Sequence, residues 1–159
     1  MFGLFKSPPF LDAQLGELTR SRGHWRGTLA LEGGASVPLA LAGSRSQPDA
    51  QAVAAAHDVP KRLAEWRASI EAALFEHHEP YAEANAADDL ESPGQAMPGI
   101  PAANQVWPHV SLVFVSVTPL DGVLTVELGY AAAWDEEHTL GARFQANRFV
   151  KLCGSVLPA

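Results

Sequence analysis

The sequence contains a single cysteine, few basic side chains and no long hydrophobic run. With Cys153 alone, neither a disulfide framework nor a cysteine-rich zinc site can form. No apolar stretch approaches the roughly 20 residues that a membrane-spanning helix needs, so we expect no membrane insertion. The first ten residues are interrupted by Lys6, Pro8 and Pro9 and do not resemble a signal peptide. These absences predict a cytoplasmic protein.

Basic charge is scarce throughout the chain. Eleven Lys and Arg residues stand against 18 Asp and Glu residues, which gives a net charge of -7. Proteins that bind nucleic acid neutralise phosphates with clustered Lys and Arg, so we expect no nucleic-acid partner. An acidic surface instead favours encounters with a basic protein partner, because charge steers association.

Common catalytic motifs are also missing. The sequence has no GxSxG, no phosphate-binding P-loop and no GxGxxG after a strand. Cys153 lies in an apolar run and lacks the electropositive setting of a reactive thiol. We therefore predict no cofactor, and an enzymatic function is not favoured.

What remains is the composition of a folded protein. The chain has 159 residues, of which 47% are hydrophobic and 18% charged, and this fits one domain over residues 1–159. Residues 1–11 are apolar but contain Pro8-Pro9, which predicts an N-terminal arm. Residues 86–108 are rich in Pro and Gly and predict a long loop.

Three strands are expected before the middle of the chain, at residues 15–20, 24–31 and 36–41. Glycine-containing turns separate them, and apolar and polar residues alternate along them. Pro38 cannot donate a hydrogen bond to a neighbouring strand, which predicts that the third strand lies at a sheet edge.

Two helices should follow. A shorter one is expected over residues 50–56, and a long amphipathic one from about residue 58 to 83. Pro80 predicts a kink or an early end near Glu79. The apolar positions of the long helix are spaced by three and four and share one face: Leu63, Trp66, Ile70, Ala73, Leu74, His77 and Tyr81.

Four more strands are expected after the long loop. Residues 109–117 are apolar on both faces and predict a central strand, and Asp121-Gly122 predicts a hairpin to residues 123–130. Segments around 142–144 and 149–152, joined by a turn at residues 145–147, complete the set. Because strands occur in runs and helices together, the order predicts an α+β fold. We expect an antiparallel sheet of about six to seven strands, with the long helix and the shorter helix packed on one face.

The segment from Trp134 to Gly141 places reactive side chains where one predicted strand ends and the next begins. A carboxylate beside an imidazole can orient it and tune its pKa. The candidates for catalysis are Asp135, Glu136, Glu137 and His138, and the candidate metal ligands are His77, His78 and His138. Their spacing matches no common metal motif.

A second interpretation of the same segment is a structured turn. Asp135 would then bond backbone N–H groups, Trp134 would bury its ring, and Glu137 or His138 would pair with Arg143. The sequence leaves both interpretations open.

The run Trp134–Phe144 follows the pattern W-D-x-E-H-x-L-G-x-x-F. It resembles the signature of a family of small, uncharacterised bacterial domains of unknown function. The segments Leu15–Leu18, Trp25–Gly27 and Val37–Leu39 are similar to the opening of the same domains. Some of these domains resemble members of toxin-immunity neighbourhoods, which implies a binding role and no assigned activity.

Two functions follow as hypotheses. The first is a non-catalytic protein-binding module, immunity-like in the sense of that resemblance, with Trp134, Trp107, Tyr130 and Arg143 as candidate binding residues. The alternative is a metal-dependent hydrolase or another small enzyme built on Asp135, Glu137 and His138. The sequence makes no prediction of oligomeric state.

Overall fold

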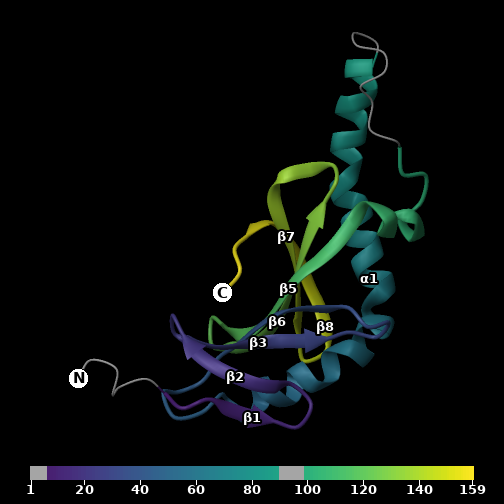
Figure 1. The fold of residues 1–159 in the computed structure, drawn as a ribbon. Coiled ribbons are helices and arrows are strands. Elements are labelled where there is room, and N and C mark those ends of the chain that lie inside the picture. Colours follow the sequence, from purple (N-terminus) through teal and green to yellow (C-terminus); the bar gives the residue numbers. More distant parts are fainter. Residues whose placement is uncertain (1–6, 90–98) are drawn as a thin grey trace.

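The computed structural model describes residues 7–89 and 99–159 as an eight-stranded sheet with one long helix (Figure 1). Residues 1–6 of the predicted arm and 90–98 of the predicted loop lie outside the described residues. The elements in chain order are β1 (Phe10–Asp12), β2 (Gly16–Ser21), β3 (His24–Ala30), β4 (Ser36–Leu41), α1 (Ala50–Asp89), the 3-10 turns η1 (Ala103–Gln105) and η2 (Trp107–His109), β5 (Val110–Leu120), β6 (Val123–Ala132), β7 (Asp135–Gln145) and β8 (Arg148–Val156).

The sheet is mixed, which corrects the prediction of a purely antiparallel sheet of six to seven strands. The strands lie in the order β1 to β8, and every neighbouring pair is antiparallel except β4 and β5. Leu39 of β4 pairs with Val115 of β5 in the parallel sense. Parallel neighbours need a long crossover connection, and α1 provides it.

Tight turns were predicted well because each contains a glycine or asparagine, the residues that tolerate positive φ. Arg22-Gly23, Asp121-Gly122 and Ala146-Asn147 each connect adjacent strands with positive φ at both positions. Such turns match the right-handed twist of antiparallel strands. The hairpin predicted at Asp121-Gly122 is therefore confirmed.

Pro38 does not mark a sheet edge, because β4 lies between β3 and β5. It pairs with Thr28 of β3, whereas the pairing of β4 with β5 starts one residue later, at Leu39. Pro38 thus lies in the part of β4 that is not paired with β5. The backbone N–H that proline lacks would therefore not have donated a hydrogen bond to β5.

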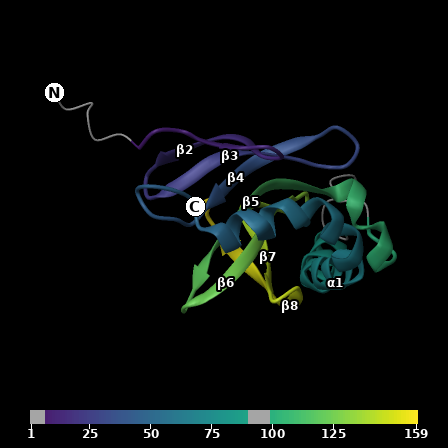
Figure 2. The same cartoon turned by 90° about the horizontal axis from the view of Figure 1, so that it is seen from below.

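The prediction of two helices was wrong, since α1 runs without a break through Pro60 and Pro80. Its first turns lie in a different direction from the rest of the helix (Figures 1 and 2). A proline inside a helix removes one backbone hydrogen bond and bends the axis, and we attribute this change of direction to Pro60. α1 also extends to Asp89, beyond the predicted start of the long loop, while β1 includes the end of the predicted arm.

The main core lies between α1 and the inner face of the sheet. Trp66 of α1 stacks on Phe144 of β7, with ring centroids 4.0 Å apart. Ile70 and Leu74 continue the buried stripe of the helix, as their spacing predicted. The largest fully buried residue is Trp25, whose Nε1 donates to the carbonyl of Ser44 at 2.8 Å.

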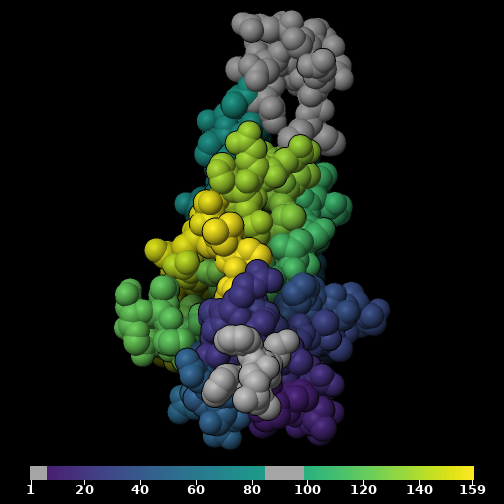
Figure 3. All heavy atoms as spheres, turned by 60° about the vertical axis from the view of Figure 1, so that its left-hand side comes forward, coloured from purple at the N-terminus to yellow at the C-terminus, as the bar shows by residue number. Residues whose placement is uncertain are grey.

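The outer face of the sheet points away from α1 (Figure 3). Phe114 of β5 is buried on this side, where Pro158 and Ala159 lie close to it. Beyond Phe114 the exposed residues are small, among them Ser111, Val113 and Ala131. Within residues 7–89 and 99–159, no helix has both the length and the apolar character required to cross a membrane.

Candidate functional site

The C-terminal half of α1 meets the β6–β7 hairpin at a cluster of hydrogen-bonded side chains. The hairpin turns at Ala133 and Trp134, so the polar residues predicted to form a loop instead begin strand β7. The pairing of β6 and β7 shifts register between Ala131 and Ala132. The backbone N–H of Ala133 donates to the carbonyl of His109 at 2.9 Å, which ties the turn to η2.

Asp135 is the centre of this cluster and is 7% exposed. Its carboxylate lies 2.9 Å and 3.1 Å from Nδ1 of His138, and its Oδ2 accepts a hydrogen bond from the Tyr81 hydroxyl at 2.9 Å. Burial raises the pKa of Asp135, but the hydrogen bonds from His138 and Tyr81 outweigh it and leave the pKa lowered. The carboxylate therefore joins two side chains rather than the backbone N–H groups that a structured turn would use.

Trp134 is buried, as the structured-turn interpretation predicted, but its contacts come from the helix. Its Nε1 donates to Nδ1 of His77 at 3.0 Å, and its ring meets His78 edge-on with centroids 5.4 Å apart. Nδ1 of His78 is enclosed and has no hydrogen-bond partner among the residues that the structure describes. Burial lowers the pKa of both His77 and His78.

Two of the three candidate metal ligands, His77 and His138, are engaged in other ways. Nδ1 of His77 accepts from Trp134, and Nδ1 of His138 is held by Asp135. Among the side chains that the structure describes, in residues 7–84 and 99–159, no three His, Cys, Asp or Glu are grouped so that they could hold a metal ion. His77 and His78 instead pack in an aromatic cluster with Tyr81 and Trp134.

His138 retains one feature of a catalytic base. Its side chain is 45% exposed, and Asp135 fixes its ring through Nδ1. A buried carboxylate in this position orients an imidazole. However, no Ser, Thr or Cys in the described part of the chain forms a hydrogen bond with His138. Glu136 and Glu137 are exposed and point to no shared centre.

The four predicted binding residues do not form one surface. Trp134 and Tyr130 are buried, with 5% and 3% exposure. Trp107 lies beside α1, where its Nε1 donates to Glu71 at 2.6 Å. Arg143 projects from β7 and donates to Glu127 of β6 at 2.6 Å, so the pairing expected with Glu137 or His138 was wrong.

Tyr81 was missed as a partner of Asp135, although the sequence carried a signal for it. Tyr81 follows His77 by four residues on the predicted apolar stripe, so both side chains had to face the same structure. In the fold their rings stack with centroids 5.4 Å apart. Only the tertiary structure shows that both side chains contact Trp134 and Asp135, the corner between β6 and β7.

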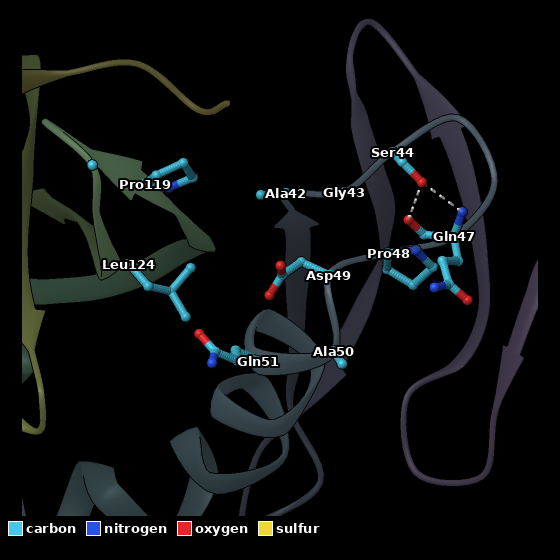
Figure 4. Close-up of a pocket in the computed structure, with 11 residues that line it drawn as sticks. Ala42, Gly43, Ser44, Gln47, Pro48, Asp49, Ala50, Gln51, Pro119 and Leu124 are labelled. Carbon is cyan, nitrogen blue, oxygen red and sulfur yellow. Dashed lines mark hydrogen bonds between the residues drawn. The ribbon is translucent and has the colours of Figure 1, made fainter.

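A separate pocket of about 540 Å³ opens at the N-terminus of α1 (Figure 4). Its wall is the segment 42–49, which Ser44 closes on itself through bonds with Gln47 at 3.3 Å and 3.4 Å. Asp49 lines the pocket and caps the helix, since its Oδ1 accepts from the N–H of Ala52 at 2.9 Å. The helix end, whose free N–H groups attract anions, thus already binds the carboxylate of Asp49.

Residues 14–155 match the model of a family described as "Domain of unknown function (DUF6985)", and the chain belongs to that family. The match covers both β segments and the helix, in agreement with the resemblance seen along the sequence. Comparison with curated proteins and with solved structures found no match for the chain.

Proposed function

We propose that this protein is a non-catalytic protein-binding module that presents the outer face of β5, β6 and β7 to a partner. The observation that carries the proposal is the exposure of this face in the described structure. Ser111 pairs with Ala131 across β5 and β6, and both are exposed, as is Val113 beside them. Residues directly opposite in antiparallel strands share a face, so these side chains form one shallow surface.

The shape of this face suits a protein rather than a small substrate. The exposed side chains at its centre, Ser111, Val113 and Ala131, carry no charge, and a flat surface of that kind buries area only against another extended surface. Val113 occupies the bulge between Leu112 and Phe114 and has no partner on β6. Its apolar side chain is exposed to solvent. The α1 side of the sheet is largely covered by the helix and the main core.

The chemistry of the corner supports a structural role for its polar residues. Both oxygens of Asp135 are within hydrogen-bond distance of neighbouring side chains, and the carboxylate joins helix α1 to strand β7. A side chain that is buried and bonded in this way holds elements together and rigidifies the sheet that forms the binding face.

Charge favours a basic partner. The net charge is -7, and Glu136 and Glu137 are exposed at the start of β7, one end of the outer face. Association should therefore slow as salt is added, because salt screens steering. An immunity-type role, in which the module covers a toxin domain, belongs to this proposal and rests on the family resemblance.

The test compares two arginine substitutions at exposed alanines. Ala131→Arg places a long charged side chain in the centre of the outer face, whereas the control Ala68→Arg places the same side chain on exposed α1. Affinity capture from the source cells, followed by reconstitution with the purified partner, should recover a complex with the wild type and A68R. Loss of that complex with A131R supports the proposal, and equal binding by both variants contradicts it.

A second candidate function rests on the Asp135–His138 pair. The 2.9 Å contact and the 45% exposure of His138 give an oriented imidazole that could act as a general base in a small enzyme. His138→Gln removes the base. A hydrolytic activity of the purified protein that this change abolishes, with the fold intact, would favour the enzyme over the binding module.

A further inference from the structure

A cavity of about 400 Å³ opens between α1 and the inner face of the sheet, next to η2. We call it the Trp107 pocket, and its walls include Pro60 and Leu63 of α1 and Leu112 of β5. Trp107 and Tyr130 form its aromatic part, with ring centroids 6.4 Å apart and planes at 61°. Small-molecule sites are typically about 300–1,000 Å³ with mainly apolar walls, and this pocket has both properties.

Tyr130 is a buried phenol among these mainly apolar walls. The residue is 3% exposed, and its hydroxyl makes no hydrogen bond to any described residue. The hydroxyl oxygen is not completely enclosed by protein. Buried tyrosine hydroxyls usually have a partner, because a donor left without one costs free energy. Since Tyr130 lines the pocket, a bound molecule can supply the missing acceptor.

The polar groups at the rim are already paired with each other. The Arg67 guanidinium lies 4.7 Å from the centre of the Trp107 ring, and its Nε donates to Glu71 at 3.0 Å. The same Glu71 oxygen accepts from Nε1 of Trp107 at 2.6 Å, which fixes the orientation of the indole. With Arg67 neutralised and Glu32 also lining the pocket, the rim does not attract an anion.

We propose that the Trp107 pocket binds a small uncharged molecule with an aromatic or alicyclic body and one carbonyl oxygen. The body fills the space between α1 and the Trp107 ring, and the carbonyl accepts the hydrogen bond of Tyr130. This site lies on the helix side of the sheet, away from Ala131, so it is independent of the proposed protein-binding face.

Acetophenone is a suitable probe, because it has a flat apolar body and one carbonyl. Ethylbenzene matches it in size without the oxygen, and benzoate matches it with a negative charge. In NMR titrations of the full chain, acetophenone should shift the indole N–H signal of Trp107 in a saturable way. Ethylbenzene should bind more weakly by about two- to tenfold, the usual range for one neutral hydrogen bond, and benzoate should not bind better than acetophenone.

Two variants of the chain sharpen the test. Tyr130→Phe keeps the ring and removes the hydroxyl, so it should weaken acetophenone by about two- to tenfold and leave ethylbenzene unchanged. Ala64 lines the pocket from an exposed position of α1, and Ala64→Trp should block both probes without unfolding the protein. Unchanged urea midpoints would establish that both variants are folded.

Three results would overturn the inference. They are the absence of a saturable Trp107 shift with acetophenone, equal acetophenone affinity in the wild type and Y130F, and tighter binding of benzoate than of acetophenone. If acetophenone gives no saturable shift of Trp107, the pocket would instead be expected to accept an apolar side chain of a protein partner.

Discussion

The indole N–H of Trp134 donates to Nδ1 of His77 at 3.0 Å, so a tryptophan in the β6–β7 turn depends on a neutral histidine of α1. A histidine protonated at both nitrogens has no acceptor to offer. The bond therefore joins helix and sheet only while His77 is uncharged, and its ring lies beside Tyr81 in the same cluster.

The first prediction concerns the pH dependence of stability. Burial lowers the pKa of His77 and His78, so the unfolded chain takes up these protons more readily than the folded one. The stabilisation is complete above the ordinary histidine pKa of about 6.5 and is lost as pH falls from there towards the folded pKa values. Urea unfolding between pH 7.5 and 5 should show a falling free energy of unfolding.

Two substitutions identify the groups that cause this loss. His77→Asn retains an acceptor near the position of Nδ1, and His78→Phe retains a ring against Trp134. The double variant should have a flatter pH profile over the same range. An unchanged slope would show that other groups control acid sensitivity.

The second prediction concerns the clamp between Tyr81 and Asp135. Tyr81→Phe removes a hydrogen bond to a buried carboxylate, and should lower the free energy of unfolding by about 1–3 kcal/mol. Tyr130→Phe is the matched control, because the Tyr130 hydroxyl has no partner among the described residues, and should change stability little. Urea unfolding at pH 7 measures both.

A double-mutant cycle with Asp135→Asn tests whether the two residues act together. Their coupling energy should lie within about 0.5–3 kcal/mol, as for directly bonded side chains. Additive effects of the two substitutions would contradict the clamp.

The third prediction concerns Gly129 on the outer face. A Cβ added at this position would overlap the Phe114 ring, and the backbone of Gly129 needs no positive φ. Gly129→Ala should therefore destabilise the protein by about 1–3 kcal/mol through steric overlap alone. Phe114→Leu shortens the opposing side chain, so the F114L/G129A variant should lose less than the sum of the two single losses. Thermal unfolding of the four proteins provides the comparison, and strict additivity would refute the steric explanation.

Local features were predictable because they depend on a few adjacent residues. The turns at Asp121-Gly122 and Ala146-Asn147 and the buried stripe of α1 follow from backbone preferences and periodicity. The central position of β5 follows from its two apolar faces.

Errors arose where a local rule competed with packing. Two helices were expected, the second starting near Asp58, but α1 continues through Pro60 without a break. A proline costs one hydrogen bond and bends the axis, and burial of Val59 and Ala56 against the sheet can outweigh that cost. The parallel pairing of β4 with β5 was missed because it depends on where a 40-residue helix returns the chain.

The sequence by itself determined the α+β class, the turn positions, the buried face of the helix and the segment in which polar residues gather. Only the tertiary structure decided what those residues contact. Asp135 lies 54 positions from Tyr81, and Trp134 lies 57 positions from His77. Such pairs depend on how α1 packs across the sheet and on the sheet register together, and no local preference encodes either. The corner that had two interpretations along the sequence is therefore a clamp between helix and sheet.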